Sequence, residues 1–301
     1  MVLHSSRAGE VNILLSAVLW SMFPVITILS FGSVPPLFSA GISTLFAGVF
    51  FAGLLTAKKE WPLLLKFEAW KDIMLTTAFI GIAFYGFMFL GLKHTSAGNG
   101  AILSLMEVFF SFFILGILLR HEPLLPRTVI GGACMVLGAL LVLIPKGAGG
   151  WQQGDLLIII ATAFAPIGNR FAQRARKVVT TNVIMFLRSI ISGVFLLILA
   201  NWFESIPTHA DIVGALGFLI INGVLLLGLS KILWIEGIHR IPITKAISIE
   251  SITPLLTLLV AWLVLYEAPS VLQISAIVPI GVGMVLLTKS SSKPLEVVSP
   301  N

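Results

Sequence analysis

Apolar segments of about twenty residues recur ten times along the chain, and this feature constrains the fold more than any other. A bilayer core about 30 Å thick is crossed by about 20 apolar residues in helical conformation. Composition agrees, because 57% of the residues are hydrophobic and 11% are charged, with a mean hydropathy of +1.05. The sequence therefore predicts an all-α integral membrane protein with ten transmembrane helices. The predicted spans are residues 11–31, 35–57, 70–92, 97–119, 127–145, 154–173, 181–203, 212–235, 243–265 and 270–288.

The positive charges predict how these helices are oriented. Cytoplasmic loops of membrane proteins are enriched in Lys and Arg. If the N-terminus is cytoplasmic, fifteen of the 19 Lys and Arg residues fall in cytoplasmic segments. Only Lys93 and Lys146 fall on the opposite side, while Arg188 and Lys231 lie within predicted helices. Both the N- and C-termini are therefore expected to be cytoplasmic, and the alternation also supports an even number of spans.

The chain has the pattern of two copies of one unit. Shifting the sequence by 145 residues places Glu122 on Glu267 without a gap, and the same shift places Gly9 on Gly154. Similarity at a fixed period indicates an internal duplication. The predicted organisation is a first five-helix repeat at residues 9–146, a second at residues 154–289 and a disordered cytoplasmic tail at residues 290–301.

Five helices per copy is an odd number, so the second copy must enter the membrane from the opposite side. Two similar halves of inverted orientation can exchange conformations around a site near the midplane, and so open alternately to each side. Alternating access is typical of transporters, but channels and intramembrane enzymes can also contain repeats. The predicted repeat favours a carrier without deciding its function.

The two units also share a motif. In AILSLMEVFFSFFILGILLRHE (101–122) and AISIESITPLLTLLVAWLVLYE (246–267), a helix begins with small residues and ends at a glutamate, and a glycine-bearing helix follows. Pro254 precedes the second glutamate by thirteen residues, whereas the matching position of the first unit is Phe109. Trp20 lies in the first predicted helix. In these features the whole chain resembles the EamA-type members of the drug/metabolite transporter superfamily, and more narrowly the YddG-type aromatic amino-acid exporters.

This resemblance implies a ten-helix carrier of the bacterial inner (cytoplasmic) membrane. Such carriers are usually exporters of amino acids, metabolites or amphipathic drugs. The substrate class is implied by the resemblance alone, because no motif in the sequence names a substrate.

Ionisable residues inside the predicted helices are the strongest functional candidates. A charge at the bilayer centre costs about 2.5–3.5 kcal/mol on insertion scales, so each one needs a partner or a wet cavity. Glu107 lies on a polar stripe with Ser104, and such a stripe lines a pathway or else lets two helices pack. We predict that Glu107, Lys231 and Glu250 belong to the pathway, whereas Arg188 is interpreted as part of a structural ion pair.

Neutral polar and aromatic side chains complete the predicted site. Asn99 and Asn169 lie in the fourth and sixth predicted helices and can hydrogen-bond a polar solute. Trp20, Tyr85 and Trp234 offer flat faces to an aromatic or amphipathic solute. The alternative for these three is packing or a place in the aromatic belt at the membrane interface.

Prolines inside three predicted helices are candidate gating hinges. Proline lacks a backbone N–H and interrupts helical hydrogen bonding. Pro166 and Gly168 in APIGNR (165–170) are expected to break the sixth helix and free carbonyls for a binding site, with a packing kink as the alternative. Pro24 and Pro254 carry the same two interpretations.

These features favour a secondary active or facilitative exporter of amino acids or similar small metabolites. One alternative is a proton-coupled multidrug antiporter, in which Glu107 or Glu250 alternates between a proton and a cationic drug. An intramembrane enzyme is disfavoured, because acid, base and nucleophile do not cluster at one depth. The sequence has one cysteine, Cys134, and lacks both HExxH and a phosphate-binding glycine loop. We therefore expect no metal, cofactor, ATP-driven pumping or nucleic-acid partner, and a small molecule and the bilayer as the binding partners.

Overall fold

The computed structural model describes residues 2–114, 126–143 and 152–290, and these segments are almost entirely helical. Glu122, Lys146 and the tail that follows Ser290 lie outside the described residues. Within them, seven helical stretches are long and apolar enough to cross a membrane. The seven are Arg7–Ser30, Pro36–Lys58, Phe67–Lys93, Pro126–Leu143, Gln153–Ala175, Thr181–Phe203 and His209–Ile238, and shorter apolar helices cover Ala97–Phe112, Thr253–Leu265 and Val271–Leu287.

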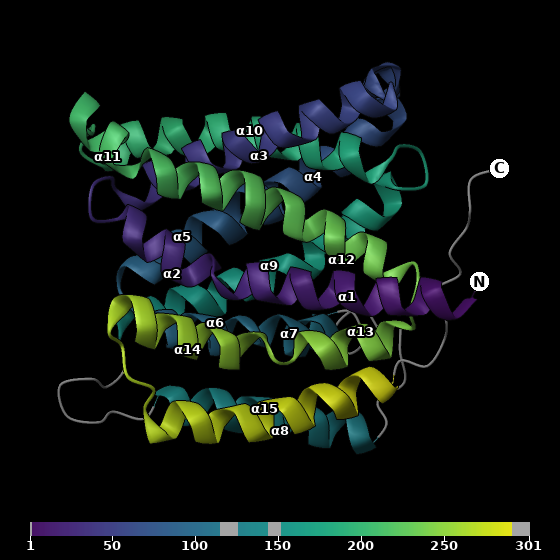
Figure 1. Ribbon diagram of the computed structural model, residues 1–301, viewed down its shortest axis with the longest axis vertical. Coiled ribbons are helices and arrows are strands. Elements are labelled where there is room, and N and C mark those ends of the chain that lie inside the picture. The colour runs from purple at the N-terminus through teal and green to yellow at the C-terminus, as the bar shows by residue number, and fades with distance from the viewer. Residues whose placement is uncertain (1, 115–125, 144–151, 291–301) are drawn as a thin grey trace.

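The helical elements lie side by side in a bundle (Figure 1). Helices α8 and α15 pack together at one side, α3, α10 and α11 lie at the other, and α1, α6, α7 and α9 lie between them. The elements before the second gap are α1 (Val2–Ser21), α2 (Phe23–Ser30), α3 (Pro36–Lys58), η1 (Trp61–Leu65), η2 (Phe67–Ala69), α4 (Trp70–Thr76), η3 (Thr77–Phe84), α5 (Tyr85–Lys93), α6 (Ala97–Ser104), α7 (Met106–Phe112) and α8 (Pro126–Leu143). Those after it are α9 (Gln153–Ala175), α10 (Thr181–Phe203), α11 (His209–Ile220), η6 (Ile221–Leu229), α12 (Ser230–Ile238), α13 (Ile243–Glu250), α14 (Thr253–Leu265) and α15 (Val271–Ser290).

Two of the predicted helices are interrupted where a proline follows. Helix α1 gives way to α2 at Met22, and Pro24 is the second residue of α2. Likewise α13 ends at Glu250, and Pro254 is the second residue of α14. Because a proline has no N–H for the carbonyl four residues earlier, the helical ladder is weakened at both places. These breaks were not predicted as boundaries, although both prolines were predicted as hinges.

The fourth predicted helix is also divided, here without a proline. Helices α6 and α7 meet at Leu105, whose N–H bonds to the carbonyl of Ile102 at 3.2 Å in a tighter turn. The Ser104 hydroxyl donates to the carbonyl of Ala101 at 2.8 Å. Back-bonding of this kind bends helices. The bend lies directly before Glu107.

The prediction that Pro166 and Gly168 break the sixth helix is wrong. Helix α9 is continuous from Gln153 to Ala175 with Pro166 inside it. Both residues are buried. A Cβ atom at position 168 would lie 2.4 Å from Cγ1 of Ile80, so the glycine lets η3 approach closely. The structure therefore favours the packing interpretation of this segment.

Elements that lie 144 or 145 residues apart have similar backbone features. The segments η3 and η6 are both π-helical and both continue into α-helices. The junction at Leu105 corresponds to the break after Glu250. Helix α3 packs on α10, and α8 packs on α15, so that each pairs with the helix that matches it under the shift.

A carboxylate lies at the start of each helix in the α3–α10 pair, and one of the two caps backbone N–H groups. Glu204 accepts hydrogen bonds from the backbone N–H groups of Leu37, at 2.7 Å, and Phe38, at 3.0 Å. In the matching place, Glu60 accepts one from Nδ2 of Asn182 at 2.8 Å. Negative charge at a helix N-terminus is favourable because the helix dipole is positive there. Burial raises the pKa of Glu204, and its two backbone hydrogen bonds act in the opposite direction.

Replacing this cap gives the first testable result. Glu204→Ala is expected to lower the free energy of unfolding by about 1 kcal/mol, because two N–H groups at the start of α3 lose their acceptor. Thermal unfolding of the detergent-solubilised protein measures the effect. Glu68→Ala replaces an exposed glutamate of η2 and should leave the melting temperature unchanged. Equal melting temperatures for the two variants would contradict the capping role.

Candidate functional site

Four ionisable side chains from four helices interact inside the bundle and form what we call the charged cluster. Its members are Glu107 of α7, Arg188 of α10, Lys231 of α12 and Glu250 at the end of α13. Lys231 interacts electrostatically with the other three, and the two glutamates interact with each other. Arg188 is buried, whereas the other three are partly exposed. With every group ionised, two carboxylates balance two cations.

The negative side of the cluster is anchored to α9. Nδ2 of Asn169 donates a hydrogen bond to Oε1 of Glu107 at 3.1 Å. Asn169 is exposed, although α9 is apolar enough to cross a membrane. An exposed amide bonded to a partly exposed carboxylate, both on membrane-spanning elements, is the arrangement expected beside a polar path.

The positive side of the cluster contacts an aromatic ring. Nζ of Lys231 lies 3.3 Å from the centroid of the Trp20 ring, which itself stacks on Phe23 with centroids 4.7 Å apart. Among the described residues, the Lys231 ammonium forms no hydrogen bond and no ion pair within 4.0 Å. Cation–π contacts of this kind are worth about 0.5–2 kcal/mol. The ring is therefore its only close partner there, with Glu250 and Glu107 acting from farther away.

Arg188 is held more firmly. Its Cζ lies 5.8 Å from the ring centroid of Tyr85, and the two residues are 8% and 3% exposed. Its stem packs on η3, where a Cβ atom at Gly81 would lie 3.2 Å from Cγ of Arg188. Tyr85 also interacts electrostatically with Glu107. Arg188 thus has the tight packing of a structural residue and borders the charged cluster. Among the described residues it forms no ion pair within 4.0 Å, so the ion pair predicted from the sequence is not observed.

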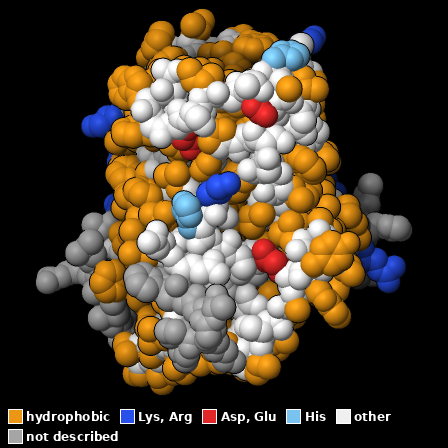
Figure 2. All heavy atoms as spheres, turned by 90° about the vertical axis from the view of Figure 1, so that its left-hand side faces the viewer, with side chains coloured by type: hydrophobic (Ala, Val, Ile, Leu, Met, Phe, Trp, Pro, Cys, Tyr) orange, Lys and Arg blue, Asp and Glu red, His pale blue; other side chains and the backbone are white. Residues whose placement is uncertain are grey.

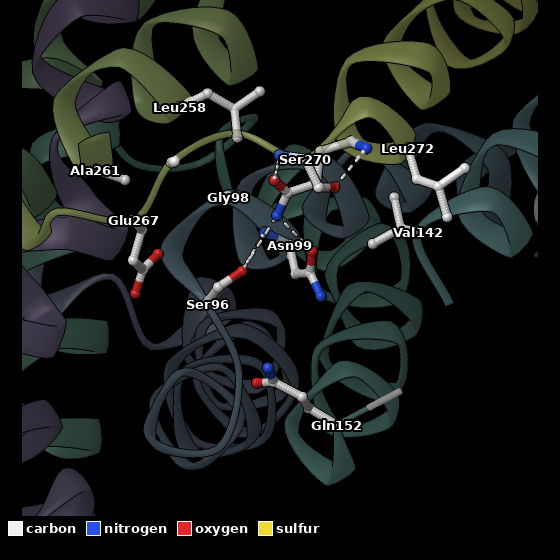
Figure 3. A pocket seen from close by; sticks show the side chains of 12 residues that line it. Ser96, Gly98, Asn99, Val142, Gln152, Leu258, Ala261, Glu267, Ser270 and Leu272 are labelled. Atoms are coloured by element: carbon white, nitrogen blue, oxygen red, sulfur yellow. Dashed lines mark hydrogen bonds between the residues drawn. The ribbon is translucent and has the colours of Figure 1, made fainter. Parts of the chain in front are cut away.

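A second polar network joins the ends of α6, α9 and α15. The Asp155 carboxylate accepts hydrogen bonds from Nδ2 of Asn99, at 3.2 Å, and from the Thr95 hydroxyl. Nε2 of Gln273 donates to Oδ1 of Asn99 at 2.8 Å, and Figure 3 shows where Asn99 lies in this network. Asn99 therefore connects three helices at one end of the bundle, away from the charged cluster.

This network borders a pocket of about 280 Å³. Glu267 lines the same pocket, just beyond the end of α14, and Oε2 accepts a hydrogen bond from the N–H of Ala97 at 3.0 Å. Burial raises the pKa of Glu267, and the bond from Ala97 lowers it. The carboxylate caps the start of α6, so it ties the two halves of the chain together at this end.

Comparison with known proteins decides the family. The profile of the EamA-like transporter family matches residues 7–144 and, a second time, residues 152–289. The chain belongs to the EamA-like transporter family. It is a multi-pass membrane transporter, and it acts on a small-molecule substrate.

Two proteins similar to this EamA-like transporter are distant from it in sequence. It is similar to YoaV of Bacillus subtilis (strain 168), described as an uncharacterized transporter, with 23% identity over 237 residues that make up 78% of this chain and 80% of that protein. A protein crystal structure superposes with a TM-score of 0.63 at 18% identity, covering 94% of this chain and 97% of the other. At such identity the likeness shows the fold alone.

The structure brings together some of the residues predicted for the site and separates others. Trp234 packs near Ile13 and Ala246 in a separate hydrophobic cluster, and the Ser104 hydroxyl bonds within its own helix. In the described parts of the chain, no three His, Cys, Asp or Glu side chains gather closely enough to hold a metal ion. The predicted residues that meet at or beside the charged cluster are Trp20, Tyr85, Glu107, Asn169, Lys231 and Glu250.

Proposed function

We propose that this EamA-like transporter exports amino acids or similar small zwitterionic metabolites across the bacterial inner membrane. The observation that carries the proposal is the charge balance of the charged cluster. A zwitterion adds no net charge to this site, so it can pair with both signs inside an apolar protein. A monovalent cation would leave an uncompensated charge, which is costly where the dielectric constant is low. Neutral and aromatic amino acids fit these requirements, because Trp20 and Tyr85 add aromatic surface beside the charges.

We further propose that ten transmembrane helices form two inverted repeats with both termini in the cytoplasm. Support comes from the two family matches and from the pairing of α3 with α10 and of α8 with α15. The start of α1 and the end of α15 lie on the same side of the bundle (Figure 1). The opposite end carries few Lys and Arg side chains away from its rim, as expected for the face that points away from the cytoplasm (Figure 2).

Alternating access in this fold requires flexible points within helices and a contact that closes one end of the bundle. The breaks beside Pro24 and Pro254 supply joints in helices next to the charged cluster, whereas Pro166 sits in a continuous helix and is the weaker hinge candidate. At the end away from the termini, Asn99 and Gln273 are joined by a hydrogen bond, so opening that end requires their separation.

The function is tested by flux through the purified protein in liposomes. We expect exchange of radiolabelled neutral amino acids without an imposed pH gradient, in a panel that also contains cationic dyes. Protein-free liposomes provide the control. Efflux of cationic dyes that depends on a proton gradient, with no amino-acid flux, would instead establish the antiporter alternative.

A further inference from the structure

We propose that Lys231 binds the carboxylate group of the substrate. When no substrate is bound, the Trp20 ring holds the ammonium group of Lys231. This inference rests on the proposed transport of amino acids. It names the ligand chemistry of the charged cluster as a small molecule with a free carboxylate beside an ammonium group.

The first step of the argument is the absence of an acceptor for Lys231. A lysine ammonium has three donors, and within a membrane protein such a group normally pairs with a carboxylate or a carbonyl. Within the described chain the only close partner of Nζ is the Trp20 ring, at 3.3 Å. A π face balances part of the charge but accepts no conventional hydrogen bond. An incoming carboxylate oxygen would supply such an acceptor.

The second step is the difference between the two cations of the cluster. Arg188 is 8% exposed and packed on both η3 and Tyr85, so its guanidinium is fixed. Lys231 is partly exposed and carries its charge on a flexible four-carbon stem. Lys231 can therefore exchange one partner for another at small cost, and Arg188 cannot.

The third step is the place left for the substrate ammonium. Oε1 of Glu107 is occupied by Asn169, and Oε2 forms no hydrogen bond among the described residues. Glu107 and Lys231 interact electrostatically although they form no ion pair within 4.0 Å. A zwitterion between them would give each charge a partner, with its carboxylate on Lys231 and its ammonium on Glu107.

The position of Trp20 gives this exchange a structural consequence. Trp20 is the penultimate residue of α1, immediately before the break at Met22, whereas Lys231 belongs to α12. While the ammonium rests on the ring, it connects the two helices at the break. Removal of the ammonium by a carboxylate releases that connection, so occupancy of the site is communicated to a predicted hinge.

The test compares Lys231→Gln with the wild type in liposomes, using a transported amino acid and its carboxamide, which lacks the carboxylate. In the wild type, the carboxamide should compete at least tenfold more weakly than the amino acid. In Lys231→Gln, amino-acid transport should fall at least tenfold and this preference should disappear. Lys231→Arg should retain part of the transport activity and part of the preference for the amino acid over its carboxamide. Lys245→Gln is the matched control, because Lys245 pairs with Glu10 at 2.6 Å on the exposed surface and should behave like the wild type.

A spectroscopic measurement covers the case in which Lys231→Gln does not fold. Addition of the amino acid should change the tryptophan emission of the wild type, and Trp20→Phe should abolish that change. Amino-acid transport with an unchanged preference in Lys231→Gln, or emission changes that are the same in Trp20→Phe, would overturn the inference and leave the proposed function intact. If the wild type moves no amino acid at all, the proposed function itself fails.

Discussion

In the Glu107→Gln variant, amino-acid transport is expected to fall at least tenfold while the protein inserts and unfolds like the wild type. Glutamine keeps the Oε1 atom that accepts the 3.1 Å hydrogen bond from Asn169, so the local geometry is preserved. What changes is the charge, because Lys231 and Arg188 then face a single carboxylate, Glu250. A tenfold loss corresponds to about 1.4 kcal/mol.

The control for this variant is Glu236→Gln. Glu236 is exposed and pairs with Arg240 one helical turn away, at 3.2 Å. Surface pairs of this kind contribute about 0–1 kcal/mol, so this variant should transport at the wild-type rate. Liposome flux and thermal unfolding are measured for both variants. Unchanged flux in Glu107→Gln would remove the residue from the mechanism.

The helices were predictable from the sequence wherever a continuous apolar run determines their extent. The span predicted at residues 181–203 is observed as α10, Thr181–Phe203, because the length of an apolar run sets the length of the helix. The division at Leu105 was not predictable in this way. It depends on the Ser104 side chain bonding to its own backbone and on packing around α6 and α7, and a hydropathy pattern contains neither.

The sequence predicted which residues belong to the site better than it predicted which of them contact each other. Glu107, Lys231 and Glu250 stand out because a charge inside an apolar run is costly. The sequence could not tell that Trp20 rather than Trp234 would contact Lys231, since both are aromatic residues of membrane-spanning helices. Asp155 was not predicted as a site residue, because its role in joining α6 to α9 depends on three-dimensional contacts.

Gly154→Ala is expected to destabilise the protein strongly. A Cβ atom at position 154 would lie 2.2 Å from the carbonyl oxygen of Gly91 and 2.5 Å from the carbonyl carbon of His94. Both neighbours are backbone atoms, so no side chain can move aside. The N–H of Gly154 also donates to the His94 carbonyl at 3.1 Å, and this bond would be stretched as α9 and α5 separate. Overpacking costs about 1–3 kcal/mol, and rigid neighbours place this variant at the upper end.

Gly217→Ala makes the same chemical change at a position that has no such close approach of a neighbouring helix. Beyond its chain neighbours and the backbone of its own helix, no atom of the described residues lies within 4 Å of a Cβ at position 217 in α11. Because alanine favours a helix over glycine by about 1 kcal/mol, this variant should melt at or above the wild-type temperature, whereas Gly154→Ala should melt below it. Opposite changes in melting temperature for the two Gly→Ala variants would attribute the lost stability of Gly154→Ala to the close approach of α9 and α5 rather than to helix propensity. A Gly154→Ala protein that melts at the wild-type temperature would show that the two helices can separate at no cost.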